Sequence, residues 1–307
     1  MRQAERGFAL VAVMLVLGLL GIIAAEFAYS MRLEAEAMRA WRDHMRAAHL
    51  AEAAVGQALR ELAGDFQVVS LPFDGVLTFY KQGPPTVILP RMARTKVRLG
   101  AGEFSYRITD EQARLNVNTA TQDQLDQLLQ CLGVDKIVRD QIVDSILDWI
   151  DTNDDHRLNG AESDDYYLKL PTPYRARNAR IESVDELLQI KGVTPAIFEG
   201  LEGRPGLRDV LTARTPSNSP NINTAGPVVF CAMRLSSADV SEIMQHRLEA
   251  PYAAGQTSRW SGFGIISNTF RIEAEGLIEG RPRASVTAIV QRGRNNVPVV
   301  LEWSGVR

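Results

Sequence analysis

The feature that most constrains this chain is an uncharged run of 18 residues at positions 8–25. A helix needs ~20 apolar residues to cross the hydrocarbon core of a bilayer, and Phe27 and Ala28 extend the run beyond Glu26. A secretory signal would have a shorter apolar segment ending in an Ala-x-Ala cleavage site, which residues 24–27 do not offer. The sequence therefore predicts a membrane-spanning helix that stays on the protein.

An amphipathic pattern continues this helix far beyond the membrane. Apolar residues recur at helical spacing as far as Ala63, and no proline stands before Pro72. A single helix over residues 8–63 would be ~85 Å long, so we expect its second half to pack on a domain outside the membrane. Stripes of this kind are usually core, and the residues expected to be buried there are Met31, Met38, Trp41, Met45, Ala48, Val55, Leu59 and Leu62.

Period-two alternation predicts strands on both sides of a helical block. A hairpin pattern surrounds residues 100–102, and residues 110–249 then follow a helical period. The simplest topology inserts this block into one sheet, so that early strands pair with late ones. We predict an α+β fold: a long N-terminal helix on an antiparallel sheet, with a large all-α domain inserted between strands. The expected strands are residues 96–99, 104–108, 270–274, 286–290 and 299–303.

Three capped helical hairpins recur inside the block, beginning near Leu115, Ile181 and Asn221. They resemble the helix-hairpin-helix of DNA-binding proteins, in which a glycine pair lets backbone N–H groups approach a phosphate. Here Asp135 and Thr194 stand where the second glycine should be, and a carboxylate repels a phosphate. We therefore expect structural hairpins and no nucleic acid partner. DNA binding or DNA uptake remains the alternative function.

The one cluster of residues in the sequence that could bind a ligand is acidic. Residues 110–169 hold 14 acidic and 5 basic side chains, a local charge of −9 in a chain with a formal net charge of −3. Residues 151–162 follow a predicted helix and place oxygen donors at positions 1, 3, 5, 9 and 12 of an EF-hand loop. Arg157 can offer its carbonyl at position 7, whereas His156 stands where the sharp turn favours glycine.

Hard oxygen donors without clustered histidine or cysteine favour calcium over zinc. We expect one or two structural calcium ions in this loop, and the alternative is a solvated acidic loop. The best ligand candidates are Asp151, Asn153, Asp155, Arg157, Asn159 and Glu162, and further candidates, for two sites that share ligands, are Asp148, Asp164 and Asp165.

Motifs for catalysis are missing from the sequence. Neither Gly-x-Ser-x-Gly nor a phosphate loop nor a dinucleotide fingerprint occurs, and the four histidines are isolated, so we expect no enzyme; a hydrolase is the alternative. Cys131 and Cys231 fit no metal spacing. They would pair outside the cytoplasm or stay as two buried thiols, and the sequence leaves both states open.

The junction Arg6-Gly7-Phe8 resembles the processing signal of type IV pilins and type II secretion pseudopilins. The resemblance implies that prepilin peptidase cuts after Gly7 and methylates the new N-terminus at Phe8. In that family the fifth mature residue is usually a glutamate that pairs with the terminal amine of a neighbouring subunit, and here it is Ala12. A subunit without this carboxylate suits the tip of a filament. An ordinary single-pass anchor is the alternative.

A second resemblance covers the acidic region and, with Gly7 and Ala12, nearly the whole chain. Residues 145–151, 160–162, 166–168, 173–174, 178 and 185–188 are similar to the minor pseudopilin K family of type II secretion systems. The resemblance implies a calcium-bound helical domain inserted into a pilin-type sheet. It also implies a subunit that caps or initiates the pseudopilus, for protein export across the outer membrane, with minor pseudopilins of the I and J type and the major pseudopilin as partners.

The same resemblance implies a single-pass protein of the bacterial inner membrane whose soluble domain lies in the periplasm. The expected organisation of the chain is a prepilin leader at 1–7, a transmembrane part at 8–30, a first pilin-like part at 31–109, an inserted helical domain at 110–250, and C-terminal pilin-like strands at 251–307.

Overall fold

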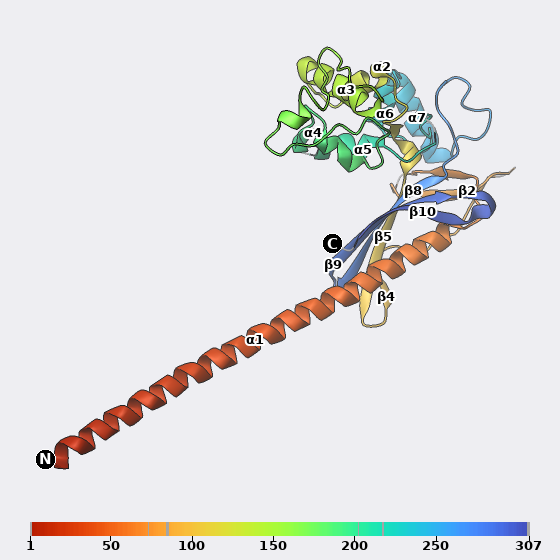
Figure 1. Cartoon of the computed structure of the whole chain (residues 1–307). Helices are drawn as coiled ribbons and strands as arrows, with labels where there is room; N and C mark the ends of the chain where they lie inside the picture. The colour runs from red at the N-terminus through yellow and green to blue at the C-terminus, as the bar shows by residue number, and fades with distance from the viewer. Residues whose placement is uncertain (1, 73, 84–85, 202, 217, 306–307) are drawn as a thin grey trace.

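The computed structural model describes residues 2–72, 74–83, 86–201, 203–216 and 218–305, and their side chains except those of residues 2–9 and 294. Figure 1 shows three parts: a long helical rod, a sheet that lies on the last turns of the rod, and a helical head on the side of the sheet away from the rod. The head comprises residues 111–268, between the two strands that leave and re-enter the sheet.

The rod is the single helix α1 (Arg2–Leu62), as the sequence predicted. Its last third packs on the sheet through a row of alanines, Ala47, Ala51, Ala54 and Ala58, all fully buried. Small side chains at this spacing let the helix and sheet backbones approach closely. The approach is closest at Gly276, where a Cβ atom would lie 1.8 Å from the carbonyl oxygen of Ala47.

The predicted burial of the first half of the amphipathic stripe is wrong. Met31, Met38 and Trp41 are 51%, 62% and 61% exposed, and Met45 is 38% exposed. The contact with the sheet begins near His44, whose Nδ1 lies 2.9 Å from the carbonyl oxygen of Arg283, and fully buried side chains begin only at Ala47. Met31, Met38 and Trp41 come before this contact (Figure 1). The second half of the stripe is buried or partly buried as predicted, at Ala48, Val55, Leu59 and Leu62.

The sheet is antiparallel and has the strand order β10-β9-β8-β5-β4. Its register pairs Glu103 with Leu277 and Asp110 with Phe270, so the predicted pairing of early with late strands is confirmed. A smaller antiparallel sheet has the strand order β1-β2-β3 and lies between α1 and β4 in the sequence. The strands are β1 (Val68–Ser70), β2 (Thr78–Lys81), β3 (Val87–Ile88), β4 (Val97–Leu99), β5 (Gly102–Asp110), β8 (Thr269–Ile278), β9 (Arg281–Arg292) and β10 (Pro298–Ser304).

The head has its own apolar core, separate from the core between α1 and the sheet. The prediction named helices alone here, and the structure adds a short parallel pair of strands, in which Leu115 lies opposite Leu211. The elements are η1 (Glu111–Ala113), β6 (Leu115–Asn116), α2 (Gln122–Cys131), α3 (Lys136–Ile150), η2 (Tyr167–Lys169), η3 (Val184–Gln189), α4 (Pro195–Glu199), α5 (Leu207–Val210), β7 (Leu211–Thr212), α6 (Pro227–Ala232) and α7 (Ser237–Glu249).

A buried carboxylate joins the head to the sheet. Asp110 ends β5, and its side chain accepts hydrogen bonds from the backbone N of Gln112 (2.8 Å), Asn221 Nδ2 (3.2 Å), Thr224 Oγ1 (2.5 Å) and Ser267 Oγ (2.5 Å). Burial raises the pKa of Asp110 to about 6, although these hydrogen bonds oppose the shift. The outgoing strand, the head and the returning strand thus meet at one side chain.

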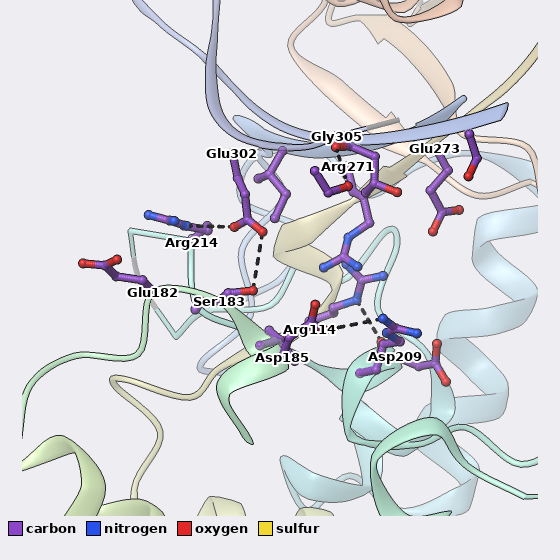
Figure 2. A pocket seen from close by; sticks show the side chains of 17 residues that line it. Arg114, Glu182, Ser183, Asp185, Asp209, Arg214, Arg271, Glu273, Glu302 and Gly305 are labelled. Atoms are coloured by element: carbon purple, nitrogen blue, oxygen red, sulfur yellow. Dashed lines mark hydrogen bonds and ion pairs between the residues drawn. The ribbon is translucent and has the colours of Figure 1, made fainter. Parts of the chain in front are cut away.

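A cleft of about 300 Å³ lies between the head and the sheet (Figure 2). Glu302 of β10 accepts hydrogen bonds from Ser183 Oγ (3.4 Å) and Arg214 Nε (3.3 Å), both in the head. Deeper in the cleft, Arg114 Nε donates to the carbonyl oxygen of Asp209 (2.9 Å). Since the polar groups pair with one another across the cleft, its walls hold the head on the sheet.

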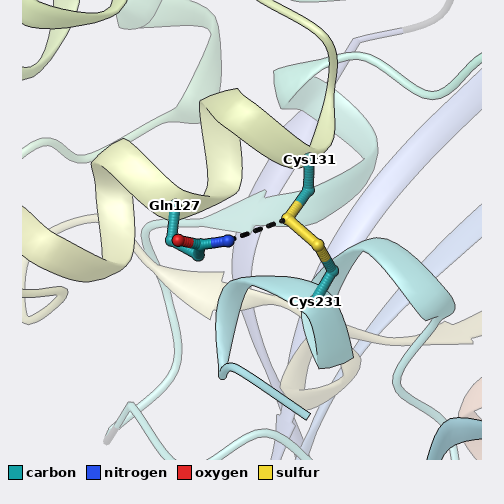
Figure 3. The surroundings of a disulfide bond; sticks show 3 residues. All are labelled: Gln127, Cys131 and Cys231. Atoms are coloured by element: carbon teal, nitrogen blue, oxygen red, sulfur yellow. Dashed lines mark hydrogen bonds between the residues drawn. A yellow bond between two sulfur atoms is a disulfide. The ribbon is translucent and has the colours of Figure 1, made fainter. Parts of the chain in front are cut away.

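A disulfide closes the head, which the sequence left undecided. Cys131 at the end of α2 is bonded to Cys231 of α6, with 6.2 Å between their Cα atoms (Figure 3). Gln127 Nε2 lies 3.8 Å from the Cys131 sulfur. The two cysteines are 100 residues apart in the sequence of the head.

Candidate metal centre and exposed anchor helix

The acidic loop after α3 is folded around Asp148, whose side chain is fully buried. Its carboxylate accepts hydrogen bonds from the backbone N atoms of Arg157 (3.1 Å) and Ala161 (3.0 Å) and from Arg157 Nη1 (2.5 Å). Gly160 passes so close that a Cβ atom there would lie 1.9 Å from Asp148 Oδ2. Only glycine fits this approach, which explains why the loop turns here rather than at His156.

The first three predicted ligands form turns in which a side-chain oxygen accepts a hydrogen bond from the backbone two residues later. Asp151 caps the C-terminus of α3 and accepts from the backbone N of Asn153 (3.4 Å), whose Oδ1 in turn accepts from the backbone N of Asp155 (2.8 Å). Such turns are typical of Asp and Asn. Asp151 is partly exposed, and Asn153 and Asp155 lie on the exposed rim.

The other predicted ligands divide between two places. Asn159 donates from its backbone and side-chain N atoms to Asp144 Oδ2, at 3.1 and 2.9 Å, so it is directed toward α3. Asp165 Oδ1 accepts from the backbone N of Glu162 (2.7 Å), and Asp164 is exposed. Among the predicted ligands, the structure therefore brings Asp148, Asp151 and Arg157 into direct contact. Glu162 is buried and feels the charges of Asp148 and Asp151, and the other predicted ligands lie at the rim or in other contacts.

Glu162 is the residue that points to a cation. It is 2% exposed, and neither of its carboxylate oxygens has a hydrogen-bond partner among the described residues. Burial, followed by the charges of Asp148, Asp151 and Asp154, raises its pKa to about 7. An unpaired carboxylate buried beside other carboxylates is costly unless a cation neutralises it. The donor chemistry of the loop fits calcium.

Two residues near this centre were missed by the ligand prediction. Asn178 Nδ2 donates to Asp154 Oδ1 (2.8 Å) and to the carbonyl oxygen of Asn153 (3.0 Å), and Asn178 Oδ1 is buried without a partner in the described chain. Asp154 is at the fourth position of the loop, which does not supply a ligand in an EF-hand. Asn178 lies 25 residues beyond Asn153, so no local spacing could have placed it here.

Among the described residues, no three acidic, histidine or cysteine side chains already converge as a complete metal site. The contacts of the loop give the reason, because the Arg157 guanidinium lies between Asp148 and Asp151, at 2.5 and 2.8 Å.

The anchor helix is the second functional feature. Residues 10–62 contain a stretch with a mean hydropathy of 2.6 that is not buried within the described structure, which suits a single-pass membrane anchor. Gly7 and Phe8 lie within α1, and their side chains are outside the described set. Beyond the length that a bilayer covers, Met31, Leu33 and Trp41 are still 51–61% exposed.

The helical hairpins have the contacts of structural turns. Asp135 caps α3 and accepts from the backbone N of Ile137 (3.0 Å). Its carboxylate thus occupies the end of the helix at which a DNA-binding hairpin would hold a phosphate.

Comparison with known proteins shows which family this chain resembles. The family model described as type II secretion system (T2SS), protein K matches residues 105–204, from β5 through the acidic loop to the turn after α4. The type II secretion system protein K of Pectobacterium carotovorum subsp. carotovorum is 27% identical over 287 residues, covering 88% of this chain and 81% of the relative. This chain is similar to the type II secretion system protein K family. The protein K of Pseudomonas aeruginosa is 26% identical over 251 residues, covering 76% of this chain and 69% of that protein.

A solved structure shares the fold of this chain. The crystal structure of the GspK-GspI-GspJ complex from the enterotoxigenic Escherichia coli type 2 secretion system contains a chain that matches with a TM-score of 0.60. The match covers 89% of this chain and 98% of that chain at 18% identity. The predicted α+β pilin-like fold is confirmed, and the comparisons support the predicted resemblance to protein K. The family is named as a component of a secretion system, not as an enzyme.

Proposed function

We propose that this protein is a non-enzymatic minor pseudopilin at the tip of the type II secretion pseudopilus. It binds minor pseudopilins of the I and J type and the major pseudopilin, and it initiates or caps the filament for protein export across the outer membrane. The observation that carries the proposal is the exposed apolar surface of α1 between the membrane and the sheet.

The apolar residues of α1 are too many for a membrane anchor alone, so part of them can serve as a surface for partner helices. A bilayer core is satisfied by ~20 residues, so residues 8–30 are enough for the anchor. Met31, Leu33, Met38 and Trp41 follow, on a part of the rod that neither the bilayer nor the sheet covers, and each is more than half exposed. Partner helices packed along the rod would bury them. The solved relative is a complex of GspK with GspI and GspJ, which supports partners of this type.

Three further features support the location and the tip role. Disulfides persist in oxidising compartments, so the Cys131–Cys231 bond supports a head in the periplasm and an anchor in the bacterial inner membrane. Cleavage after Gly7 by prepilin peptidase and methylation of Phe8 would expose the apolar helix as a mature N-terminus. Ala12 then lacks the carboxylate with which a further subunit would pair, so the filament ends here.

The proposal predicts that Trp41→Glu weakens the complex with the I- and J-type partners by about tenfold or more, because a charge replaces an anchor at a helix–helix contact. The measurement is co-purification of the full-length chain with both partners from detergent-solubilised membranes. Glu34→Gln, a polar exposed position on the same part of the rod, is the control and should co-purify normally.

If deletion of the chain left filament number and length unchanged, the tip role would be contradicted.

The competing DNA-binding or DNA-uptake function gains no support from the hairpins, since the Asp135 carboxylate already satisfies the start of α3. The absence of a nucleic acid partner stays a prediction.

We also propose that the acidic loop holds one or two structural calcium ions. Glu162, Asp151, Asn153 and Asp155 are the side chains best placed to bind them, with the carbonyl oxygen of Arg157. Asp148, Asn159, Asp164 and Asp165 would complete or support the site. Bound calcium would supply positive charge to the buried Glu162 carboxylate and hold the loop against α3.

Calcium should therefore raise the melting temperature of the full-length chain in detergent micelles. At a concentration 100 times Kd the stabilisation would be about 2.7 kcal/mol. The measurement is thermal unfolding in calcium and in excess chelator. Glu162→Gln keeps the shape but removes the buried charge, so it should fold in chelator and lose the response to calcium. Identical wild-type melts in the two conditions would remove the calcium proposal.

A further inference from the structure

The acidic loop has a very uneven charge balance. Residues 148–168 contain seven carboxylates and a single arginine or lysine, Arg157. The C-terminus of α3 points into this region and carries no basic residue in its last turn. Because the C-terminal end of a helix is the negative end of its dipole, it adds to the local negative potential. A cation at this place would offset the repulsion between the carboxylates.

Arg157 supplies that cation from within the chain. Its Nη1 atom lies 2.5 Å from Asp148 Oδ1 and 2.8 Å from Asp151 Oδ2. The Asp148 side chain is fully buried and that of Asp151 is 25% exposed, whereas the guanidinium side chain is 38% exposed. The guanidinium thus reaches in from the solvent side and bridges two carboxylates that would otherwise repel each other.

The same two carboxylates act on the buried Glu162. Among the charged groups that raise its pKa, Asp148 has the largest effect and Asp151 the next. A divalent ion that neutralises Glu162 must therefore lie within reach of the carboxylates that Arg157 holds. A guanidinium and a calcium ion are both positively charged and repel each other. They therefore cannot both bind the same carboxylate oxygens at full strength.

We propose that Arg157 is an internal counter-cation that competes with calcium for Asp148 and Asp151 and thereby sets the calcium concentration at which the loop loads. The inference rests on the proposed calcium site. In this arrangement Arg157 keeps the loop folded at low calcium. The loop then binds calcium weakly, and it exchanges one cation for the other without unfolding.

The backbone of Arg157 has a separate role, which makes the side chain testable by itself. Its N atom donates to Asp148 Oδ2 (3.1 Å), and its carbonyl oxygen accepts from the backbone N of Gly160 (3.0 Å). Arg157→Gln keeps both backbone contacts and removes only the guanidinium. Arg208 is a matched control, because it also bridges two acids, Glu199 and Asp185, and its side chain is 39% exposed.

The test is isothermal titration of the full-length chain in detergent micelles with calcium chloride, together with thermal unfolding in chelator. Arg157→Gln should bind calcium about tenfold more tightly than the wild type, which corresponds to about 1.4 kcal/mol, and it should melt at a lower temperature in chelator. Arg208→Gln should leave the calcium affinity unchanged. Arg157→Lys keeps a charge but not the two-carboxylate fork, and its affinity should fall between those of the wild type and Arg157→Gln.

The outcomes separate this inference from the calcium site itself. If the wild type binds calcium and Arg157→Gln binds it equally or more weakly, the competition is overturned while the site stands. If neither protein binds calcium, the site is absent. If Arg157→Gln does not fold, Arg157→Lys decides, since an affinity no tighter than that of the wild type would contradict competition.

Discussion

Replacing both Cys131 and Cys231 by serine should lower the free energy of unfolding of the head by about 4–5 kcal/mol. The bond closes a loop of 100 residues, and a crosslink of this length removes much of the chain entropy of the unfolded state. The sheet and α1 have a separate apolar core, so they should stay folded when the head opens. The measurement is urea unfolding of the full-length chain in detergent micelles, followed by near-ultraviolet circular dichroism of the head aromatic residues.

The oxidised protein provides its own control for this prediction. Reducing the wild type should reproduce the unfolding midpoint of the double variant, and the reductant should leave the double variant unchanged. Equal midpoints for oxidised wild type and double variant would show that the bond contributes nothing to the stability of the head.

Asp110→Ala should destabilise the junction of head and sheet by about 3 kcal/mol. The change removes the acceptor of four hydrogen bonds and leaves buried donors from three segments without it. Asp135→Ala is a matched control, because Asp135 also caps a helix but is exposed; the loss of such a cap costs about 1 kcal/mol. Similar losses for the two variants in urea unfolding would argue against a special role for Asp110.

The effect of Asp110→Ala should also depend on pH. The pKa of Asp110 is about 6 in the folded protein against 3.8 for the free side chain, so the folded state binds its proton more tightly. The stability that comes from this proton is fully present below pH 3.8 and is lost as the pH rises through 6. The difference between wild type and variant should therefore be larger by about 2 kcal/mol at pH 4.5 than at pH 7.5. A constant difference would contradict the raised pKa.

Local patterns predicted the elements of this fold well. The helical period and the lack of proline before Pro72 gave α1, and alternation around residues 104–108 and 270–274 gave two strands that the structure pairs. The capping Thr121 and Asp135 begin α2 and α3. Each of these signals acts over a few residues, so it survives in any tertiary context.

The errors have a common cause, which is that periodicity does not identify the partner of an apolar face. Met31, Met38 and Trp41 follow the same stripe as Val55 and were expected in the same core, yet the sheet does not reach them. Spacing likewise does not show the contacts of single residues in the loop: Asn159 donates to Asp144, and Asn178 reaches Asp154 from a distant segment.

By itself the sequence determined the membrane helix, the α+β class, the family resemblance and the acidic loop, because each depends on composition or short-range spacing. Only the tertiary structure decided that Cys131 and Cys231 pair, that Asp110 joins head to sheet, and that Arg157 lies between Asp148 and Asp151. These contacts require segments to meet in space, some of them 100 or more residues apart in the chain, and the geometry of such meetings comes from packing of the whole chain.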